Sequence, residues 1–221
     1  MRPILVAIVG GSGSGKTHLA KQLQTALGRS AGCLSLDDFY RDRSHLAPSR
    51  RARINFDHPA AIEWPLVERS LRSCLAGKVV HVPHYDFATH SRTPTASSFK
   101  PKPVVLVDGL WLFRRPALRR LFALRIFIDC PANTRLNRRL ARDQRSRGRS
   151  AASVRQQFRS TVEPMHARYV APQARSADVH LRGNWGTREV AALLRRISQL
   201  RPTTGLNPVA PLALKPIRRR S

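Results

Sequence analysis

A glycine-rich segment near the start of the chain follows directly on six apolar, β-favouring residues, Ile4 to Val9. Because glycine adopts backbone conformations that are closed to other residues, successive N–H groups of such a segment can turn inward and bind phosphate oxygens. An apolar spacing typical of a helix follows it, and the positive N-terminal end of that helix would face the same anion. The segment fits the pattern G-x-x-x-x-G-K-[ST] and consists of Gly10, Gly11, Ser12, Gly13, Ser14, Gly15, Lys16 and Thr17.

A plain Gly/Ser turn is the alternative, but the strand before the segment and the helix after it favour a P-loop. In a P-loop, Lys16 reaches the β- and γ-phosphates of a nucleotide, and the Thr17 hydroxyl binds Mg²⁺. We therefore expect ATP or GTP as a phosphoryl donor, together with Mg²⁺.

Strand and helix patterns alternate along the rest of the chain. Strand-like runs cover 33–36, 104–107, 124–128 and 177–181, and helical spacing covers 60–75, 132–146, 151–170 and 190–200. This alternation predicts an α/β fold of the P-loop NTPase type, with a doubly wound parallel sheet of about five strands and ligands at the carboxyl ends of the strands. The 221 residues suit one such domain, which we assign to 1–200. The Pro- and Arg-rich segment 201–221 is predicted to be a disordered tail.

The composition is strongly basic. The formal net charge is +27, and 34 of the 40 basic residues are arginine. Such a charge attracts polyanions, so nucleic acid stays among the candidate partners. The arginines are spread along the whole chain, however, which is also what a genome-wide bias toward arginine codons would produce.

The composition also bears on location. No apolar run approaches the ~18 residues of a membrane span, and the first strand begins without a signal-peptide pattern, so we expect a cytoplasmic protein that does not contact membranes. Three cysteines without C-x-x-C spacing predict reduced thiols and no disulfide framework or zinc site.

The segment 79–102 departs from the alternating pattern. A short strand-like run, 79–83, precedes a stretch rich in Ser, Thr, Pro and His. We interpret it as an excursion from the main sheet, a β-hairpin with a loop, and as the place where a flap over a substrate is expected.

Three carboxylates follow predicted parallel strands, namely Asp37, Asp108 and Asp129. The carboxyl ends of these strands meet at the crevice where the P-loop also lies, so carboxylates there can hold Mg²⁺ or take a proton from a hydroxyl. Asp37 and Asp108 are the better candidates. Asp129 precedes Cys130-Pro131 and serves either this site or as a cap of the next helix.

The predicted helix from residue 132 carries a row of arginines. Arg135, Arg138, Arg142, Arg145 and Arg149 are spaced 3, 4, 3 and 4 residues apart and share one helical face. Such like charges repel unless an anion neutralises them, and the planar guanidinium suits phosphate oxygens. The row therefore predicts an Arg-rich lid with a hinge at Gly148, and a solvated basic face is the alternative.

Several segments, taken in order, resemble the uridine kinase (uridine–cytidine kinase) family. The match runs from about Ile4 to Leu181, and its narrowest parts are the turn 55–59 and the cluster 85–92. The segments are the P-loop, Asp37-Asp38-Phe39-Tyr40, Asn55-Phe56-Asp57-His58-Pro59, Pro83 to Arg92, Val107-Asp108-Gly109, and Arg138-Arg139 through Arg142-Asp143 to Arg147-Gly148-Arg149.

The resemblance implies ATP-dependent phosphorylation of a pyrimidine ribonucleoside, uridine or cytidine, at its 5′-hydroxyl, in a homo-oligomer. It implies that Asp37, Lys16, Arg142 and Arg147 carry catalysis, with the two arginines binding phosphate, and that Thr17, Asp37 and Asp108 hold Mg²⁺. The implied nucleoside-binding residues are Asp37, Tyr40, Asp57, Tyr85, His90, Arg139, Arg149 and Gln157. Asp57 would bind the ribose hydroxyls, and Tyr85 and His90 would bind the edge of the pyrimidine.

The sequence departs from this pattern at position 108, where Asp stands in place of the expected Glu. Two other interpretations stay open. A related P-loop kinase of another small alcohol, such as phosphoribulose or pantothenate, predicts that Tyr85 and His90 do not contact the acceptor. A nucleotide-regulated RNA-binding protein would need aromatic residues between the arginines, and the segment 135–149 contains none.

Overall fold

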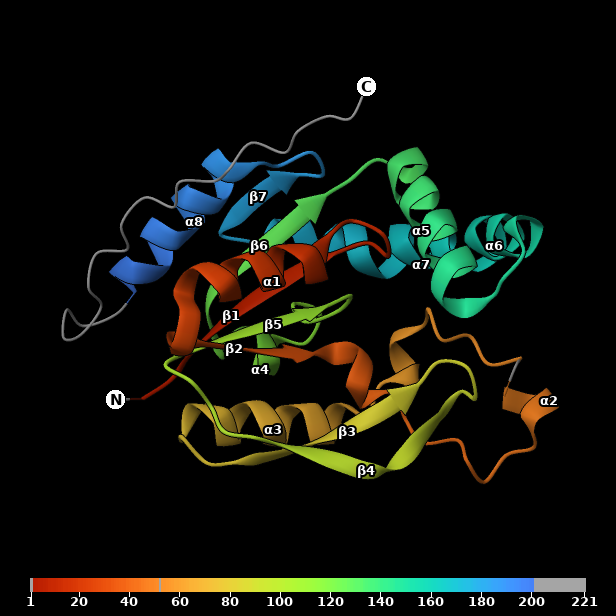
Figure 1. Cartoon of the computed structure of the whole chain (residues 1–221), viewed down its shortest axis with the longest axis horizontal. Helices are drawn as coiled ribbons and strands as arrows, with labels where there is room; N and C mark the ends of the chain where they lie inside the picture. The colour runs from red at the N-terminus through yellow and green to blue at the C-terminus, as the bar shows by residue number, and fades with distance from the viewer. Residues whose placement is uncertain (1, 52, 201–221) are drawn as a thin grey trace.

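The computed structural model describes residues 2–51 and 53–200, without the side chains of Ser146 and Arg147. Its centre is a five-stranded parallel sheet in the order β2-β5-β1-β6-β7 (Figure 1). The strands are β1 (Ile4–Gly10), β2 (Ala31–Ser35), β5 (Val104–Gly109), β6 (Phe122–Asp129) and β7 (Val179–Arg182). The predicted doubly wound parallel sheet is confirmed, and the predicted tail, 201–221, lies outside the described residues.

Helices cover both faces of the sheet, which is why β1 and β5 are apolar and buried almost throughout. Val6 and Ile8 of β1 point toward α1 (Lys16–Leu27) and α8 (Thr187–Gln199). Leu5 and Ala7 point to the opposite face, which α3 (Trp64–Leu75) and α4 (Pro116–Arg119) cover. The core therefore consists of two apolar clusters, one on each side of the sheet.

The segment between α3 and β5 forms the predicted β-hairpin. Its strands, β3 (Val80–Asp86) and β4 (Ser91–Phe99), are antiparallel and form a sheet of their own. Val80 and Val82 pack into the α3 side of the core, and Figure 1 shows the hairpin beside α3.

A helical arm follows β6. It begins with α5 (Ala132–Arg147), which ends at Gly148 in the left-handed conformation, with φ of 59°. A second run contains α6 (Ala151–Gln157), α7 (Glu163–Met165) and two π-helical turns, Phe158–Val162 and His166–Val170. The other short elements are α2 (Pro48–Arg51) and 3₁₀ turns at Gly28–Ser30, Leu36–Phe39, Pro59–Ala61 and Ala171–Ser176.

Prolines account for the two π-helical turns. The N–H of Glu163 bonds to the carbonyl of Phe158, five residues back, and Pro164 follows. The N–H of Ala171 bonds in the same way to His166, and Pro172 follows. Because the proline ring does not fit against the preceding turn of an α-helix, the helix widens there.

Two further predictions concern the described residues. Cys33, Cys74 and Cys130 form no disulfide. Within 2–51 and 53–200, no helix combines the length and the apolar character needed to cross a membrane.

Candidate active site

The P-loop joins the end of β1 to α1, and its shape depends on two glycines. Gly13 and Gly15 have φ of 81° and 100°, which other residues rarely adopt. A Cβ atom on Gly13 would also lie only 2.5 Å from the carbonyl oxygen of Arg135. The loop is closed by Gly11, whose carbonyl accepts hydrogen bonds from the backbone N–H of Ser14 and from Nζ of Lys16, both at 3.0 Å.

The register of the sheet brings the predicted carboxylates to this loop. Asp108 on β5 lies between Ser35 of β2 and Ile8 of β1. Two residues beyond Ser35 is Asp37, and two residues beyond Ile8 is Gly10, the first residue of the P-loop. Sheet pairing therefore brings Asp37, Asp108 and the start of the P-loop together at one edge. The Thr17 hydroxyl donates to Oδ2 of Asp108 at 2.6 Å.

Asp129 has neither of its two predicted roles. Its side chain is exposed and is not among those that line the cleft. The residue at the N-cap of α5 is Pro131, which has no side-chain cap. A position at the end of a parallel strand is therefore not enough to identify a residue as part of the site.

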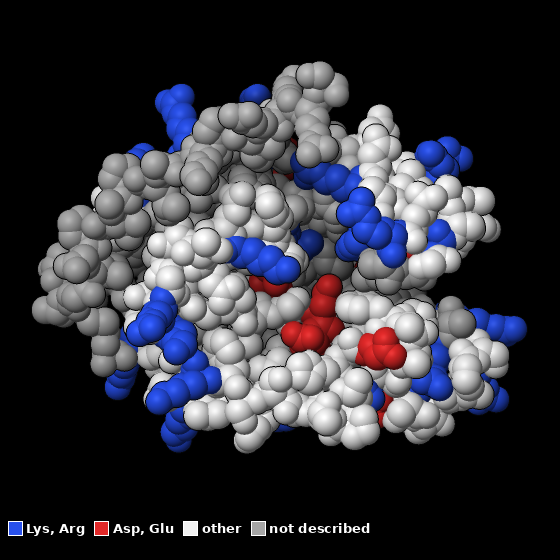
Figure 2. Space-filling model, in the orientation of Figure 1, with Lys and Arg blue, Asp and Glu red and all other residues white. Residues whose placement is uncertain are grey.

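A cleft with a volume of about 1040 Å³ lies along this edge of the sheet. Three predicted P-loop residues, Gly10, Gly11 and Ser14, are buried and are not among the residues that line it. Figure 2 shows the acidic side chains on this face gathered near its centre, below a group of basic side chains. The predicted residues that line the cleft are Ser12, Gly13, Gly15, Lys16, Thr17, Asp37, Tyr40, Asp57, Tyr85, His90, Asp108, Arg139, Arg142, Arg149 and Gln157.

One wall of the cleft is aromatic. The rings of Tyr40 and Tyr85 lie 4.9 Å apart between centroids, and the His90 ring stacks on Phe56 at 4.5 Å with an angle of 8°. The hydroxyl of Tyr40 donates to the Phe56 carbonyl at 3.0 Å. The hydroxyl of Tyr85 is buried and has no hydrogen-bond partner among the described residues. Since buried polar groups are normally hydrogen-bonded, this hydroxyl points to a ligand.

The hairpin that carries Tyr85 and His90 is fixed to the body of the protein. Arg92 of β4 donates from Nε to the carbonyl of Tyr40 at 2.8 Å and forms an ion pair with Glu63 at 2.7 Å. In the turn, Asp86 accepts from the N–H of Ala88 and from the hydroxyl of Thr89. The position of His90, at a φ of 53°, therefore depends on contacts distant in the sequence.

The opposite wall is formed by the helical arm. Arg139 donates from Nη1 to Oγ of Ser12 at 2.9 Å and from Nη2 to Oε1 of Gln157 at 2.8 Å. Arg149 donates to the same Gln157 oxygen and to Oγ of Ser153. These bonds join the P-loop, α5 and α6, so the arginines of this wall are held in place before a ligand arrives.

The prediction that five arginines form one anion-binding row is wrong in part. Arg135 is only 2% exposed and forms an ion pair with Glu163 at 2.6 Å, which makes it part of the core. Arg145 is exposed and does not line the cleft, whereas Arg138 and Arg142 do. The side chain of Arg147 lies outside the described residues.

Burial and charge shift several pKa values in the cleft. Burial lowers the pKa of Lys16, and the nearby Asp108 and Asp37 carboxylates partly offset this effect. Burial, followed by the negative charges of Asp37 and Asp57, raises the pKa of Tyr40 well above its usual range. The pKa of Asp38, next to the site, rises to about 6 because of burial and the neighbouring Asp37. The Lys16 ammonium group is therefore largely shielded from water, with the Asp37 and Asp108 carboxylates nearby.

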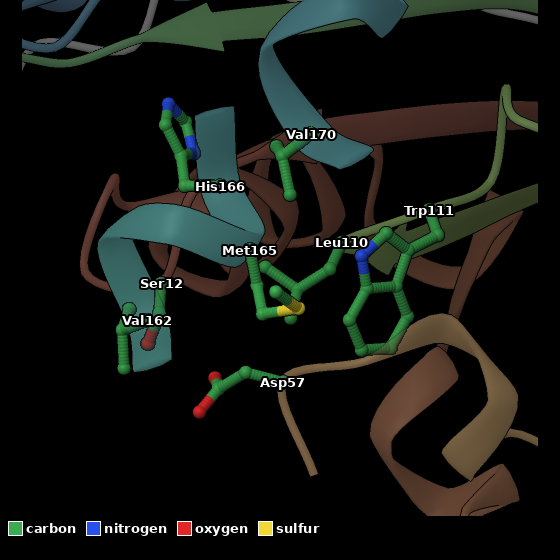
Figure 3. Close-up of a pocket in the computed structure, with 8 residues that line it drawn as sticks. All are labelled: Ser12, Asp57, Leu110, Trp111, Val162, Met165, His166 and Val170. Carbon is green, nitrogen blue, oxygen red and sulfur yellow. The ribbon is translucent and has the colours of Figure 1, made fainter. Parts of the chain in front are cut away.

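A small cavity of about 10 Å³, enough for one water molecule, lies beside the cleft (Figure 3). Ser12 and Asp57 line both spaces, and apolar side chains such as Met165 supply most of the rest. His166 is on this wall too, and burial together with the charge of Arg135 lowers its pKa from 6.5 to about 4. Because Asp57 lines both the cleft and this cavity, it lies where the cleft meets the helical arm.

The sequence interpretation missed several residues that line the cleft. Phe56 and Phe87 are in the segments that carry the resemblance, and aromatic residues inside polar loops are the signal that would have found them. Nothing in the local pattern distinguishes Ile54, Leu110 or His18. The missed cleft residues are His18, Ile54, Phe56, Asp86, Phe87, Ala88 and Leu110.

The phosphate-binding loop and the carboxylates open into one cleft, so a phosphoryl donor and an acceptor hydroxyl can meet there. This fold and this site define a P-loop kinase. The comparison with family models gives the particular family. Residues 5–187 match the Phosphoribulokinase / Uridine kinase family, and the chain belongs to it.

Known relatives agree with this membership. A uridine kinase of Chloroflexus aggregans is 43% identical over 178 residues, which are 80% of this chain and 85% of that protein. A uridine kinase of Deinococcus deserti is 40% identical over 180 residues, 81% of this chain and 87% of its own. The phosphoribulokinase structure from Rhodobacter spheroides shares the fold with a TM-score of 0.61 at 19% identity, covering 82% of this chain and 70% of that one.

Proposed function

We propose that the chain transfers the γ-phosphoryl group of ATP or GTP to the 5′-hydroxyl of uridine, and also of cytidine. The observation that carries this proposal is the Tyr85 hydroxyl, buried in the wall of the same cleft as the P-loop and without a partner among the described residues. The polar edge of a pyrimidine would satisfy that hydroxyl. The relatives named uridine kinase, about 40% identical over most of the chain, support the same substrate.

The proposed roles are those that the family resemblance implies, and the position of these side chains in the cleft supports them. The Asp37 carboxylate orients the 5′-hydroxyl and takes its proton, and Asp57 accepts hydrogen bonds from the ribose hydroxyls. His90 and Tyr85 bind the pyrimidine edge, while Tyr40 supplies ring surface beneath it.

The phosphates are held from the other side of the cleft. The P-loop N–H groups and Lys16 bind the β- and γ-phosphates, and Arg142 neutralises charge on the transferred group. The same role is proposed for Arg147 from the family resemblance alone, because its side chain lies outside the described residues. Arg139, Arg149 and Gln157 bind the nucleoside from the side of the helical arm.

The donor set at the end of β5 fits Mg²⁺. The Thr17 hydroxyl and the Asp108 carboxylate are oxygen ligands 2.6 Å apart, and Asp37 lines the same cleft. Because an Asp reaches less far than a Glu, Asp108 would hold the ion through a water molecule. When bound, Mg²⁺ would offset the negative charge of the phosphates.

A substrate panel tests the proposal. Nucleoside-dependent ADP release should be measured with uridine, cytidine, adenosine, ribulose 5-phosphate and pantothenate. We expect activity with the two pyrimidine nucleosides; activity confined to ribulose 5-phosphate or pantothenate would favour the other kinase classes. The homo-oligomer and the cytoplasmic location stay predictions.

A further inference from the structure

An aromatic pair lies beside the P-loop on the side away from the hairpin. The rings of His18 and Trp185 are 5.5 Å apart between centroids, at an angle of 29°. His18 belongs to the first turn of α1, directly after Thr17, and lines the cleft. Trp185 lies in the turn between β7 and α8, and a Cβ atom on Gly15 would be 3.8 Å from its indole nitrogen. The pair therefore borders the phosphate-binding loop.

The turn that carries Trp185 is fixed to the P-loop. Arg138 donates from Nη1 to the carbonyl of Ser14 at 3.2 Å and from Nη2 to the carbonyl of Gly183 at 2.8 Å. The backbone N–H of Trp185 donates to the carbonyl of Arg182 at 3.1 Å. Gln22 lies 3.3 Å from the His18 ring and helps to orient it. A preorganised aromatic surface of this kind loses little side-chain entropy when a ligand stacks on it.

This pair and the aromatic wall of the cleft, with Tyr40 and Tyr85, belong to opposite sides of the sheet. Trp185 packs against the apolar cluster beneath α1 and α8. Tyr40 and Tyr85 belong to the other cluster, beneath α3. In a nucleoside triphosphate the base is attached at the end opposite the γ-phosphate. A donor whose γ-phosphate faces Asp37 must therefore direct its base away from Tyr85, toward His18.

We propose that His18 and Trp185 form the platform for the base of the phosphoryl donor, with His18 as the ring facing the cleft and Trp185 as its support. This inference rests on the donor half of the proposed function. Stacking on an aromatic ring is available to every flat base, because each has a π-face. The platform therefore favours nucleoside triphosphates over simple polyphosphates, and it distinguishes adenine from guanine weakly.

Calorimetry with three probes tests the platform without an acceptor. ATP, GTP and inorganic tripolyphosphate should be titrated into the full chain and into the variants His18→Ala, Trp185→Ala and Trp185→Phe. Asn184→Ala is the matched control, because Asn184 is exposed in the same turn. His18 is exposed as well, so its variant should fold even if Trp185→Ala does not.

We expect His18→Ala to weaken ATP and GTP binding by about 5- to 150-fold, the range for losing one stacked base, and Trp185→Ala to weaken both by a smaller factor, because Trp185 only supports the His18 ring. Tripolyphosphate binding should change less than about twofold, and Trp185→Phe and Asn184→Ala should stay near wild type. Equal weakening of ATP and tripolyphosphate would mean that the pair only supports the P-loop and would overturn the proposal, as would unchanged ATP binding. If the base-dependent loss appears but uridine is not phosphorylated, the platform stands and the proposed acceptor is wrong.

Discussion

The two halves of the cleft are built in different ways. The phosphate-binding part of the donor half is one continuous segment, Gly10 to Thr17, whose conformation follows from its own glycines. The acceptor half takes Asp37, Asp57, Tyr85 and His90 from separate parts of the chain and depends on contacts such as that of Arg92 with the Tyr40 carbonyl. A change in the donor half should therefore affect every reaction of the nucleotide, whereas a change in the acceptor half should affect only the nucleoside.

The largest contrast is expected between Asp37→Asn and Lys16→Ala. Asparagine keeps the shape of Asp37 but cannot take a proton, so kcat should fall about 10²- to 10⁴-fold with ATP affinity mostly retained. Lys16 contacts the nucleotide in both the ground and transition states, so its loss should weaken binding and turnover together. Calorimetry of ATP binding beside steady-state kcat measures both, and equal loss of ATP affinity in the two variants would contradict the division into halves.

His90→Ala should separate uridine phosphorylation, which needs the acceptor half, from ATP hydrolysis without nucleoside, which does not. If the His90 ring hydrogen-bonds the pyrimidine, its removal costs about 1–3 kcal/mol, or roughly 5- to 150-fold in kcat/KM for uridine. ATP hydrolysis without nucleoside should barely change, because the P-loop is intact. Both rates are measured on one preparation. A folded variant with unchanged kcat/KM for uridine would exclude His90 from recognition.

Tyr85→Phe should have opposite effects on activity and stability. The Tyr85 hydroxyl is buried without a partner among the described residues, so removing it should leave the melting temperature unchanged or raise it. The same change should lower kcat/KM for uridine about tenfold, because the bound base loses its partner. Scanning calorimetry and kinetics measure the two effects, and Tyr40→Phe is the control, since the Tyr40 hydroxyl bonds to the Phe56 carbonyl. A loss of stability in Tyr85→Phe with unchanged kinetics would mean that the hydroxyl is structural.

The smallest effect concerns His166, which lies against the P-loop. Its pKa is lowered to about 4, so between pH 6.5 and 4 the unfolded chain binds a proton at this residue that the folded chain does not. The free energy of unfolding should therefore fall as the pH falls through that window. His166→Gln should reduce this slope, as measured by urea unfolding at pH 7, 5.5 and 4.5. Identical slopes in the two proteins would show that His166 does not titrate abnormally.

The sequence determined the phosphate-binding segment of the donor half and the class of fold. Glycine positions and apolar runs act over a few residues, so the P-loop after β1 and the parallel sheet could be predicted from local patterns. The sheet register then explains why Asp37 and Asp108 lie together, since Asp108 pairs with Ser35 and Asp37 follows Ser35 by two residues. The same reasoning gave a wrong prediction for Asp129, because a position at the end of a strand does not determine whether the side chain faces the cleft.

The tertiary structure decided what each helical face meets. The spacing of the arginines showed that Arg135 and Arg138 share a face, but it could not show that Arg135 is buried against Glu163 while Arg138 joins the P-loop to the turn before α8. Nor could it place Trp185 beside Gly15, because the two are far apart in the chain. Helical and strand periods fix which residues lie on one side of an element. Which residues of other elements that side contacts is set by the packing of the whole chain. For this reason the platform for the base was visible only in the folded protein.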